Sequence, residues 1–545
     1  MKAVKAVMDY LVNGNVTHVF GIPAGSVNAF FDELYDTPSI TPVVTKHEGA
    51  ASYMAAAYAK YSGSLGVCIA SSGPGATNLV TGAANAMREH LPVLFLTGAV
   101  PVDTVGLNAS QELHADPIYQ SVTKYSQRVD RAEELLPEIH KAVEIAMTGV
   151  PGPVHIAMPI DVQLESIAPP SIPSFPQRTK LLPRDELIAE AADKLADTKK
   201  GMILLGQGIR GAVKDALELA ELLHWPFITT PQAKGYIPDD HPLHQGVFGF
   251  AGHEQASTLV HDSEVETILI LGSSLGETAT NNWNPHLTRS KYTIQVDYDA
   301  TVFNRRYNVD LPLHGDLDVT ISSLTTALKS GDYNPAEVAV PVREKHRNDR
   351  DEYNTQNVLH ALQELLPAST RFTIDIGEFM SYVIHHMPVR SADSFDINVH
   401  FGAMGSGIGS AIGAKLADPD RPTVSITGDG CFFMHGMEIL TAKEYDIPVL
   451  FIVMNNARLG MVHHGHALQY KRAHERFGQK PVAIAEMAAS MGIPSVRIET
   501  LEDIDTETIA KILPADGPSL LEISLVDDNI PPMGDRVKFL SSFGK

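Results

Sequence analysis

Short apolar runs alternate with longer segments of helical pattern through residues 1–164. Segments 49–61 and 76–90 repeat their apolar residues at helical spacing, and the runs between the helical segments have the length of strands. These runs are THVFGI (17–22), ITPVVT (40–45), GVCIAS (66–71) and PVLFLTGAV (92–100). Strands separated by helices predict a parallel sheet that is covered by helices on both faces.

The pattern divides the chain into three such α/β blocks. A proline-rich stretch from Glu165 to Arg184 follows the first block, and a charged stretch from Val342 to Tyr353 precedes the last. Between them, GMILLGQG (201–208), VETILILG (265–272) and YTIQVDYD (292–299) predict further strands. We expect domains at 1–164, 185–328 and 354–529, followed by a tail at 530–545.

The first and last blocks resemble each other. In the first, a strand, a glycine turn, a helix and a second strand take 17 positions from Gly75 to Pro92. In the last, the same plan takes 18 positions from Gly430 to Pro448, and PVLF opens the second strand in both. Two βαβ units can match by chance, but the pattern favours two related doubly wound domains that flank a different central one.

Composition and charge narrow the function. The 545 residues are 44% hydrophobic and 20% charged, which is typical of a globular protein. The formal charge of −23 repels polyanions, so we expect no nucleic-acid partner. Cys68 and Cys431 have no metal-ligand spacing around them, and their low number predicts a reducing compartment. The opening helical segment carries Asp9 and precedes no cleavage site, and no stretch is long and apolar enough for a membrane span, so we expect a cytoplasmic protein.

The strongest chemical signal is Gly428-Asp429-Gly430, followed after 24 residues by Asn455 and Asn456. A predicted strand feeds into each turn, and parallel strands place such turns together at the carboxyl edge of the sheet, where ligands bind.

The residue types at these turns suit a magnesium ion bound to a phosphate group. Mg²⁺ prefers oxygen ligands, which Asp429, the side chain of Asn456 and the backbone carbonyl of Arg458 would supply. Gly428 and Gly430 allow a tight turn and a close approach of phosphate. A helix that begins near Cys431 would direct its N-terminus at the anion.

This pattern resembles the thiamine diphosphate signature. The family needs a carboxylate in the first domain to hydrogen-bond N1′ of the cofactor's pyrimidine, and Glu48, within TKHEGAAS, matches that role. The alternative for Glu48 alone is an acid favoured by the dipole at a helix start.

The resemblance extends over nearly the whole chain and is closest to the acetolactate synthase and pyruvate oxidase group. FGIPAGSVNAFFDEL is similar to the glycine-rich turn of that group, and SSGPGATN to its pyrimidine-contacting turn. The resemblance implies catalytic roles for Gly25 and Gln111. His114 is the third candidate catalytic residue, because imidazole titrates near neutral pH. It implies cofactor contacts from Pro74, Asn78, Gly377, Glu378, Met404, Gly428, Gly430, Cys431 and Met461. Met404 matches the apolar residue that bends the cofactor, although methionine is also a common core filler.

Several positions depart from the acetolactate synthase pattern. Ala24 stands where a second glycine is usual, and Phe379 stands where a histidine is often found, which puts diphosphate contacts there in doubt. His464 and Gly465 replace a Gln-Trp pair, so we expect a roomier, more polar acceptor pocket. The segment LGSSLGETATNNW lacks the arginine-rich run associated with FAD, so we expect FAD to be absent.

The resemblance implies a thiamine diphosphate- and Mg²⁺-dependent enzyme that decarboxylates a 2-oxo acid and transfers the resulting enamine to a carbonyl acceptor. The alternative enzyme is a 2-oxo acid decarboxylase, or a lyase for acyloins or 2-hydroxyacyl thioesters, without carboligation. A silent regulatory homologue is a third reading, which the retained Glu48, Asp429 and Asn456 disfavour. The family builds each site from two subunits, which implies a homodimer or homotetramer. His114, His463, His464 and His466 are either proton shuttles, or histidines that lie at the surface or have their hydrogen bonds satisfied within the protein.

Overall fold

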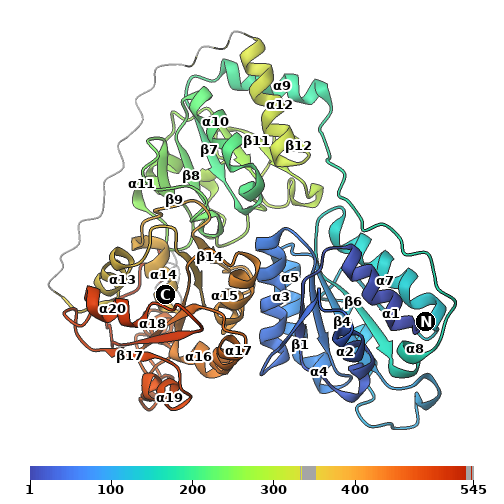
Figure 1. Ribbon diagram of the computed structural model, residues 1–545. Helices are drawn as coiled ribbons and strands as arrows, with labels where there is room; N and C mark the ends of the chain where they lie inside the picture. The colour runs from blue at the N-terminus through green and yellow to red at the C-terminus, as the bar shows by residue number, and fades with distance from the viewer. Residues whose placement is uncertain (332, 334, 336–351, 535–541, 543–545) are drawn as a thin grey trace.

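Three six-stranded parallel sheets make up the fold, each in its own domain (Figure 1). The computed structural model describes residues 1–331, 333, 335, 352–534 and 542. Most of the charged stretch 342–353 and of the tail 530–545 lies outside the described residues. The sheets lie within the three expected domain ranges, whose exact limits stay predictions.

The first domain has the strand order β2-β1-β3-β4-β6-β5, with all pairs parallel. Its strands are β1 (His18–Gly21), β2 (Thr41–Val44), β3 (Gly66–Ala70), β4 (Val93–Ala99), β5 (Tyr125–Arg128) and β6 (Val154–Pro159). Its helices are α1 (Ala3–Asn13), η1 (Gly25–Val27), α2 (Asn28–Tyr35), α3 (Glu48–Ser62), α4 (Pro74–Asn78), α5 (Val80–Arg88), η2 (Val102–Thr104), α6 (Ala115–Tyr119), α7 (Ala132–Met147) and α8 (Ile160–Leu164). The single helix expected at 76–90 is two helices, α4 and α5.

The last domain repeats this plan. Its order β14-β13-β15-β16-β18-β17 becomes that of the first domain when its strands are renumbered from one, which agrees with the expected relationship. Its strands are β13 (Arg371–Ile374), β14 (Phe395–Ile397), β15 (Thr423–Gly428), β16 (Val449–Asn455), β17 (Ser495–Ile498) and β18 (Ser519–Ser524). Its helices are α13 (Thr355–Leu365), α14 (Glu378–His386), α15 (Ser406–Ala417), α16 (Asp429–His435), η7 (Gly436–Glu438), α17 (Ile439–Glu444), α18 (Gly460–Tyr470), η8 (Glu475–Phe477), α19 (Ile484–Ser490) and α20 (Thr506–Ile512).

The central domain is wound differently, with the order β12-β11-β10-β7-β8-β9. Renumbered from one and read from the β9 edge, this is the order 3-2-1-4-5-6 of a dinucleotide-binding fold. Its strands are β7 (Gly201–Leu205), β8 (Phe227–Thr229), β9 (His244–Val247), β10 (Thr267–Leu271), β11 (Tyr292–Asp297) and β12 (Leu311–His314). Its helices are α9 (Asp185–Asp197), η3 (Gln207–Ala212), α10 (Val213–Leu223), η4 (Pro231–Ala233), α11 (Glu254–His261), η5 (Pro285–Leu287), η6 (Ala300–Val302) and α12 (Leu317–Ser330).

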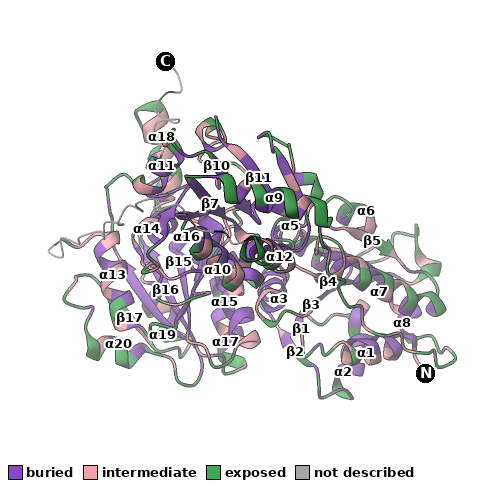
Figure 2. Ribbon diagram, turned by 90° about the horizontal axis from the view of Figure 1, so that it is seen from above, coloured by how far each residue is buried: buried purple, intermediate pink, exposed green. Residues whose placement is uncertain are grey.

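Burial follows the layered plan. Figure 2 shows buried residues concentrated on the strands, with exposed residues on the outer helices and loops. β3, β4, β6, β7, β10, β15 and β16 are buried along their whole length, as expected of parallel strands covered on both faces. No helix in the described part of the chain is long and apolar enough to cross a bilayer.

Helices α3 and α15 join the first and last domains face to face (Figure 1). Small residues permit this close packing, because a Cβ at Gly409 would lie 2.8 Å from the Ala50 carbonyl oxygen. A Cβ at Gly413 would lie 2.1 Å from the Met54 carbonyl oxygen. One hydrophobic cluster continues through both domains, so their relative position is set by packing.

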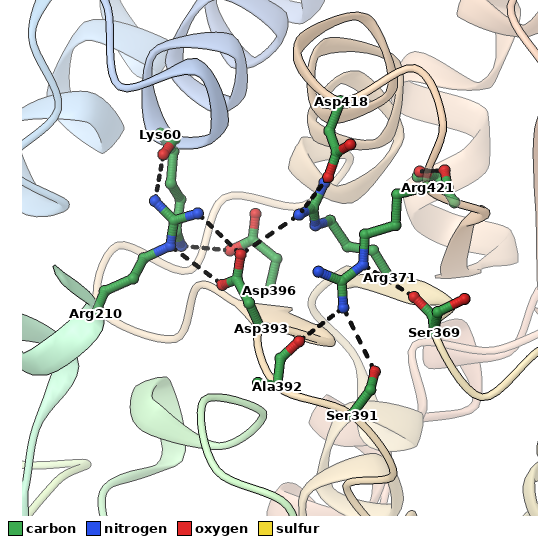
Figure 3. Close-up of polar contacts among 11 residues, drawn as sticks. Lys60, Arg210, Ser369, Arg371, Ser391, Ala392, Asp393, Asp396, Asp418 and Arg421 are labelled. Carbon is green, nitrogen blue, oxygen red and sulfur yellow. Dashed lines mark hydrogen bonds and ion pairs between the residues drawn. The ribbon is translucent and has the colours of Figure 1, made fainter. Parts of the chain in front are cut away.

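A partly buried charge network holds the three domains where they meet (Figure 3). Lys60, at the end of α3, pairs with Asp396 of the last domain at 2.7 Å. Arg210 of the central domain pairs with Asp393 at 2.9 Å and donates to the Lys60 carbonyl oxygen. Arg371 of β13 also contacts Asp393, at 3.4 Å. The network ties the C-terminal end of α3 to both other domains.

Candidate functional site

The predicted site residues lie at the carboxyl edges of the first and last sheets. In the first domain they follow the ends of β1, β2, β3 and β4. In the last domain they follow β13, β14, β15 and β16. This is the edge at which open parallel sheets bind ligands.

Glu48 is the first residue of α3, directly after the turn that follows β2. Its Oε2 accepts a hydrogen bond of 2.9 Å from Nδ2 of Asn78, and its Oε1 lies 3.2 Å from the Cβ position of Gly75. The sequence therefore brings Glu48 to the turn that contains Pro74 and Asn78. The carboxylate is half-buried and is held by one amide, which leaves it further hydrogen-bonding capacity.

Gly25 and Gln111 lie beside the same turn. Ser26, next to Gly25, accepts a 3.0 Å hydrogen bond from the Ser72 backbone N–H. Ser72 Oγ in turn donates to the Gln111 carbonyl oxygen at 2.7 Å. Gln111 has a positive φ of 62°, and its side chain is exposed, as is that of His114.

Asp429 and Asn456 lie on adjacent turns of the last domain. The register pairs Gly428 of β15 with Met454 of β16, so the turns after these two strands are adjacent. Burial raises the pKa of Asp429 to about 6, although hydrogen bonds from the Gly430 and Ala457 N–H groups oppose the rise. The helix α16 begins at Asp429, two residues before the expected start near Cys431.

The two consecutive asparagines have different surroundings. Nδ2 of Asn455 donates to Glu522 Oε1 at 2.6 Å and to the Val482 carbonyl oxygen at 2.9 Å, so this amide is bound within the domain core. Oδ1 of Asn456 accepts from the Arg458 N–H at 3.1 Å, and its Nδ2 donates to Glu378. Asn456 therefore remains the candidate ligand of the pair.

Glu378 occupies the centre of this group, which we call the cradle: Glu378, Asp429, Asn456, Arg458, Gly460 and His464. Glu378 is only 8% exposed. Its Oε2 lies 3.3 Å from Nε2 of His464, and its Oε1 lies 3.9 Å from a guanidinium nitrogen of Arg458. A Cβ at Gly460 would lie 2.2 Å from the Glu378 carboxylate, which is thus packed against the start of α18.

Apolar side chains pack against the glycines that flank the cradle. Cε of Met404 lies 3.3 Å from the Cβ position of Gly430. Phe379 is buried against the Cβ positions of Gly377 and Gly428, at 2.3 and 3.0 Å, and offers no hydrogen bond to a diphosphate. Cys431 directs its thiol to the Ile376 carbonyl oxygen at 3.0 Å, so any cofactor contact from this residue would use its backbone.

Comparisons with known proteins agree with the three-domain fold. Models of the N-terminal, central and C-terminal domains of thiamine pyrophosphate enzymes match residues 1–118, 188–324 and 375–523. A probable acetolactate synthase large subunit of Methanocaldococcus jannaschii is 32% identical over 560 residues, covering 98% of this chain and 93% of the relative. The chain belongs to the thiamine pyrophosphate enzymes of the acetolactate synthase group.

Two further comparisons extend over nearly the full length. The acetolactate synthase isozyme 2 large subunit of Escherichia coli is 29% identical, covering 98% of this chain and 97% of the relative. The solved structure of a putative thiamin diphosphate-dependent enzyme from Mycobacterium smegmatis superimposes with a TM-score of 0.84. It covers 97% of this chain and 100% of that one at 22% identity, which supports the three-domain fold.

The cradle contains groups that could bind the Mg²⁺ ion expected from the sequence. Asp429, Asn456 and the Arg458 carbonyl offer hard oxygen donors of the kind that Mg²⁺ prefers. Among the described residues, no group of three or more His, Cys, Asp and Glu side chains is placed to hold a metal, and the predicted donor set contains only one such residue. The diphosphate fits less simply, because the Glu378 carboxylate already lies against the start of α18.

Two buried acids outside the predicted set of site residues hold the site together. Glu438 of the last domain accepts the N–H groups of Lys46 at 3.0 Å and of His47 at 2.8 Å, directly before Glu48. Asp375 accepts the Gly405 N–H and the Thr427 hydroxyl, which ties the Met404 turn to β15. Their partners are remote in sequence, so no local motif marks either acid.

A cavity of about 710 Å³, which we call the central cavity, lies between the central and first domains and is lined by residues of both, with His400 of the last domain also in its wall. It lies at the switch point between β7 and β10, where the sequence reads Gly206-Gln-Gly208-Ile-Arg-Gly211. Gly206 packs so closely on the next turn that its Cβ would lie 2.2 Å from the Gly272 carbonyl oxygen. This G-x-G-x-x-G run after a strand was readable in the sequence, and the sequence analysis missed it.

Proposed function

We propose that the chain is a carboligase that decarboxylates a 2-oxo acid and transfers the remaining unit to a carbonyl acceptor, with thiamine diphosphate and Mg²⁺ as cofactors. The observation that carries this proposal is the pair of carboxyl-edge clusters. Glu48 with Asn78 lies at one edge, and Asp429 with Asn456 lies at the other. The acetolactate synthase relatives, matched over nearly their full length, support the carboligase activity.

Each cluster has a distinct task in this proposal. When bound, thiamine diphosphate supplies the carbanion that adds to the carbonyl carbon and the electron sink for decarboxylation. Glu48 would hold the proton at pyrimidine N1′, and Asn78 fixes its carboxylate by the 2.9 Å hydrogen bond. Asp429, Asn456 and the Arg458 carbonyl would hold Mg²⁺. Gly25, Gln111 and His114 remain the candidates for substrate contact.

We propose that the active form is at least a homodimer. Helix α16 begins in the cradle at Asp429 and ends at His435, whose ring lies 5.4 Å from that of His47, beside Glu48. Next to this end, three large apolar side chains are 45–54% exposed: Phe433, Met434 and Met437. An apolar patch beside both clusters supports a second subunit there, with each site completed across the interface.

Product analysis tests the proposed activity. Purified enzyme is incubated with thiamine diphosphate, Mg²⁺ and pyruvate, alone and with a second 2-oxo acid or an aldehyde. Carbon dioxide release with a ligated product supports the carboligase. Release of the free aldehyde alone would identify a decarboxylase, and cleavage of an acyloin or 2-hydroxyacyl thioester would identify a lyase.

The central cavity bears on the prediction that FAD is absent. The strand order, the glycine run and basic lining residues such as Arg178 and Arg305 suit a nucleotide-like ligand. The absorption spectrum of the purified protein decides the matter, because bound flavin gives a visible band that heat denaturation releases into solution. The expected cytoplasmic location also stays a prediction.

A further inference from the structure

The N-terminal end of α18 lies against a carboxylate of the protein itself. The first N–H groups of an α-helix have no intrahelical acceptor, so they attract negative charge. The Glu378 carboxylate is packed against Gly460, the first residue of this 11-residue helix. Its Oε2 is buried, makes no hydrogen bond, and lies 3.3 Å from His464 Nε2.

The hydrogen-bond donors and cationic side chains around Glu378 are of the kind that would also bind a diphosphate. Arg458 reaches it at 3.9 Å, while its other guanidinium nitrogen pairs with Asp528 at 2.8 Å. Asn456 donates to Oε1 with its amide nitrogen. A diphosphate placed at the start of α18 would meet a buried carboxylate, and two anions in such a site repel each other strongly.

We propose that Glu378 is a resident anion that thiamine diphosphate must displace, so that this side chain weakens cofactor binding and favours cofactor exchange. This inference rests on the proposed function. Displacement frees His464 and Arg458 for the incoming diphosphate, so one anion replaces another on the same cations. Gly460 is needed for this arrangement, since any side chain there would collide with the carboxylate.

The test is the dissociation constant of thiamine diphosphate at saturating Mg²⁺, measured calorimetrically for the wild type and for Glu378→Gln. Glutamine keeps the shape and the acceptor for Asn456 but removes the charge. We expect the constant to fall at least about tenfold, because one charge repulsion is lost in a poorly hydrated site. Inorganic diphosphate with Mg²⁺ should show the same gain, which locates the effect at the phosphates.

Asp528→Asn is the matched control. It removes a carboxylate from the same Arg458, but on the solvent side, where the Asp528 side chain is 85% exposed. We expect its effect to stay below about threefold, since exposed ion pairs are weak. If Glu378→Gln fails to melt cooperatively, Glu378→Asp replaces it, because the shorter side chain withdraws the charge from Gly460 and should also tighten binding.

The outcomes separate the two proposals. Unchanged or weaker binding by a folded Glu378→Gln protein overturns the inference and, if weaker, shows that the carboxylate supports the cation instead. Binding by the variant but not by the wild type supports the inference. If neither protein binds thiamine diphosphate, both the inference and the proposed function fail.

Discussion

Replacing Gly413 by alanine tests whether the α3–α15 contact sets the position of the first domain against the last. The new Cβ would lie 2.1 Å from the Met54 carbonyl oxygen and 2.9 Å from its Cα, whereas ordinary contacts begin at 3.4 Å. Both obstacles are backbone atoms of a buried helix, so the helices must separate. Overpacking of this kind costs about 3 kcal/mol at the upper end of its usual range. Alanine regains about 1 kcal/mol of helix propensity, which leaves a net loss of about 2 kcal/mol.

The assay is thermal unfolding by calorimetry. A loss of about 2 kcal/mol lowers Tm by roughly 4–8 °C for a domain of 150–250 residues. Gly331→Ala is the control, because the nearest atom of the described residues would lie 3.6 Å from its Cβ and its backbone φ is −88°. If the Tm of the Gly413→Ala protein lies within about 1 °C of that of the Gly331→Ala protein, the packing argument is refuted.

Three further predictions concern chemistry, assembly and pH. Glu48→Gln should lower kcat by at least about 100-fold, the usual contribution of a positioned acid or base, while calorimetry shows thiamine diphosphate still binding; unchanged turnover would contradict the assigned role. An equal mixture of Glu48→Gln and Asp429→Asn subunits should regain about a quarter of wild-type activity, because half of the dimers are mixed and each mixed dimer has one intact shared site out of two. If mass spectrometry confirms subunit exchange and no activity returns, each site lies within one chain. Burial lowers the pKa of His155 to about 3. Below pH 6.5, the ordinary pKa of histidine, only the unfolded chain gains a proton at this residue, so the free energy of unfolding decreases as the pH is lowered. Between pH 7.5 and 5.5 the loss attributable to His155 is about 1.4 kcal/mol, and urea melts of His155→Asn should lack it.

The sequence was sufficient for the features that depend on local order along the chain. Alternating strands and helices predicted the parallel sheets, and the matching βαβ units predicted two related domains with one strand order. The 24-residue spacing placed Asp429 and Asn456 on adjacent turns because β15 and β16 are neighbours. The single helix expected at 76–90 was wrong, because two helices occupy this segment, α4 from Pro74 to Asn78 and α5 from Val80 to Arg88.

Long-range side-chain contacts were beyond the sequence. Glu438 reaches the Lys46 and His47 N–H groups across about 390 positions, and no spacing rule connects them. The sequence suggested that Glu378 contacts cofactor, but not that its carboxylate would be packed against Gly460. That position depends on how α14 and α18 meet. The hydrogen bond from Asn455 to Glu522 likewise follows from the pairing of β16, which ends at Asn455, with β18, which contains Glu522.

The spacing between the two clusters is fixed by α16, and this limits how a single coenzyme can meet both. The helix has seven residues and a length of roughly 10 Å. It starts at Asp429 and ends against the Glu48 turn, which Glu438 also holds. Because both ends are packed, the clusters of one chain cannot approach further without breaking these contacts. In the proposed homodimer, a second chain would supply its own Glu48 to this Asp429, and no such rearrangement would be needed. The mixed-subunit experiment distinguishes these two geometries directly.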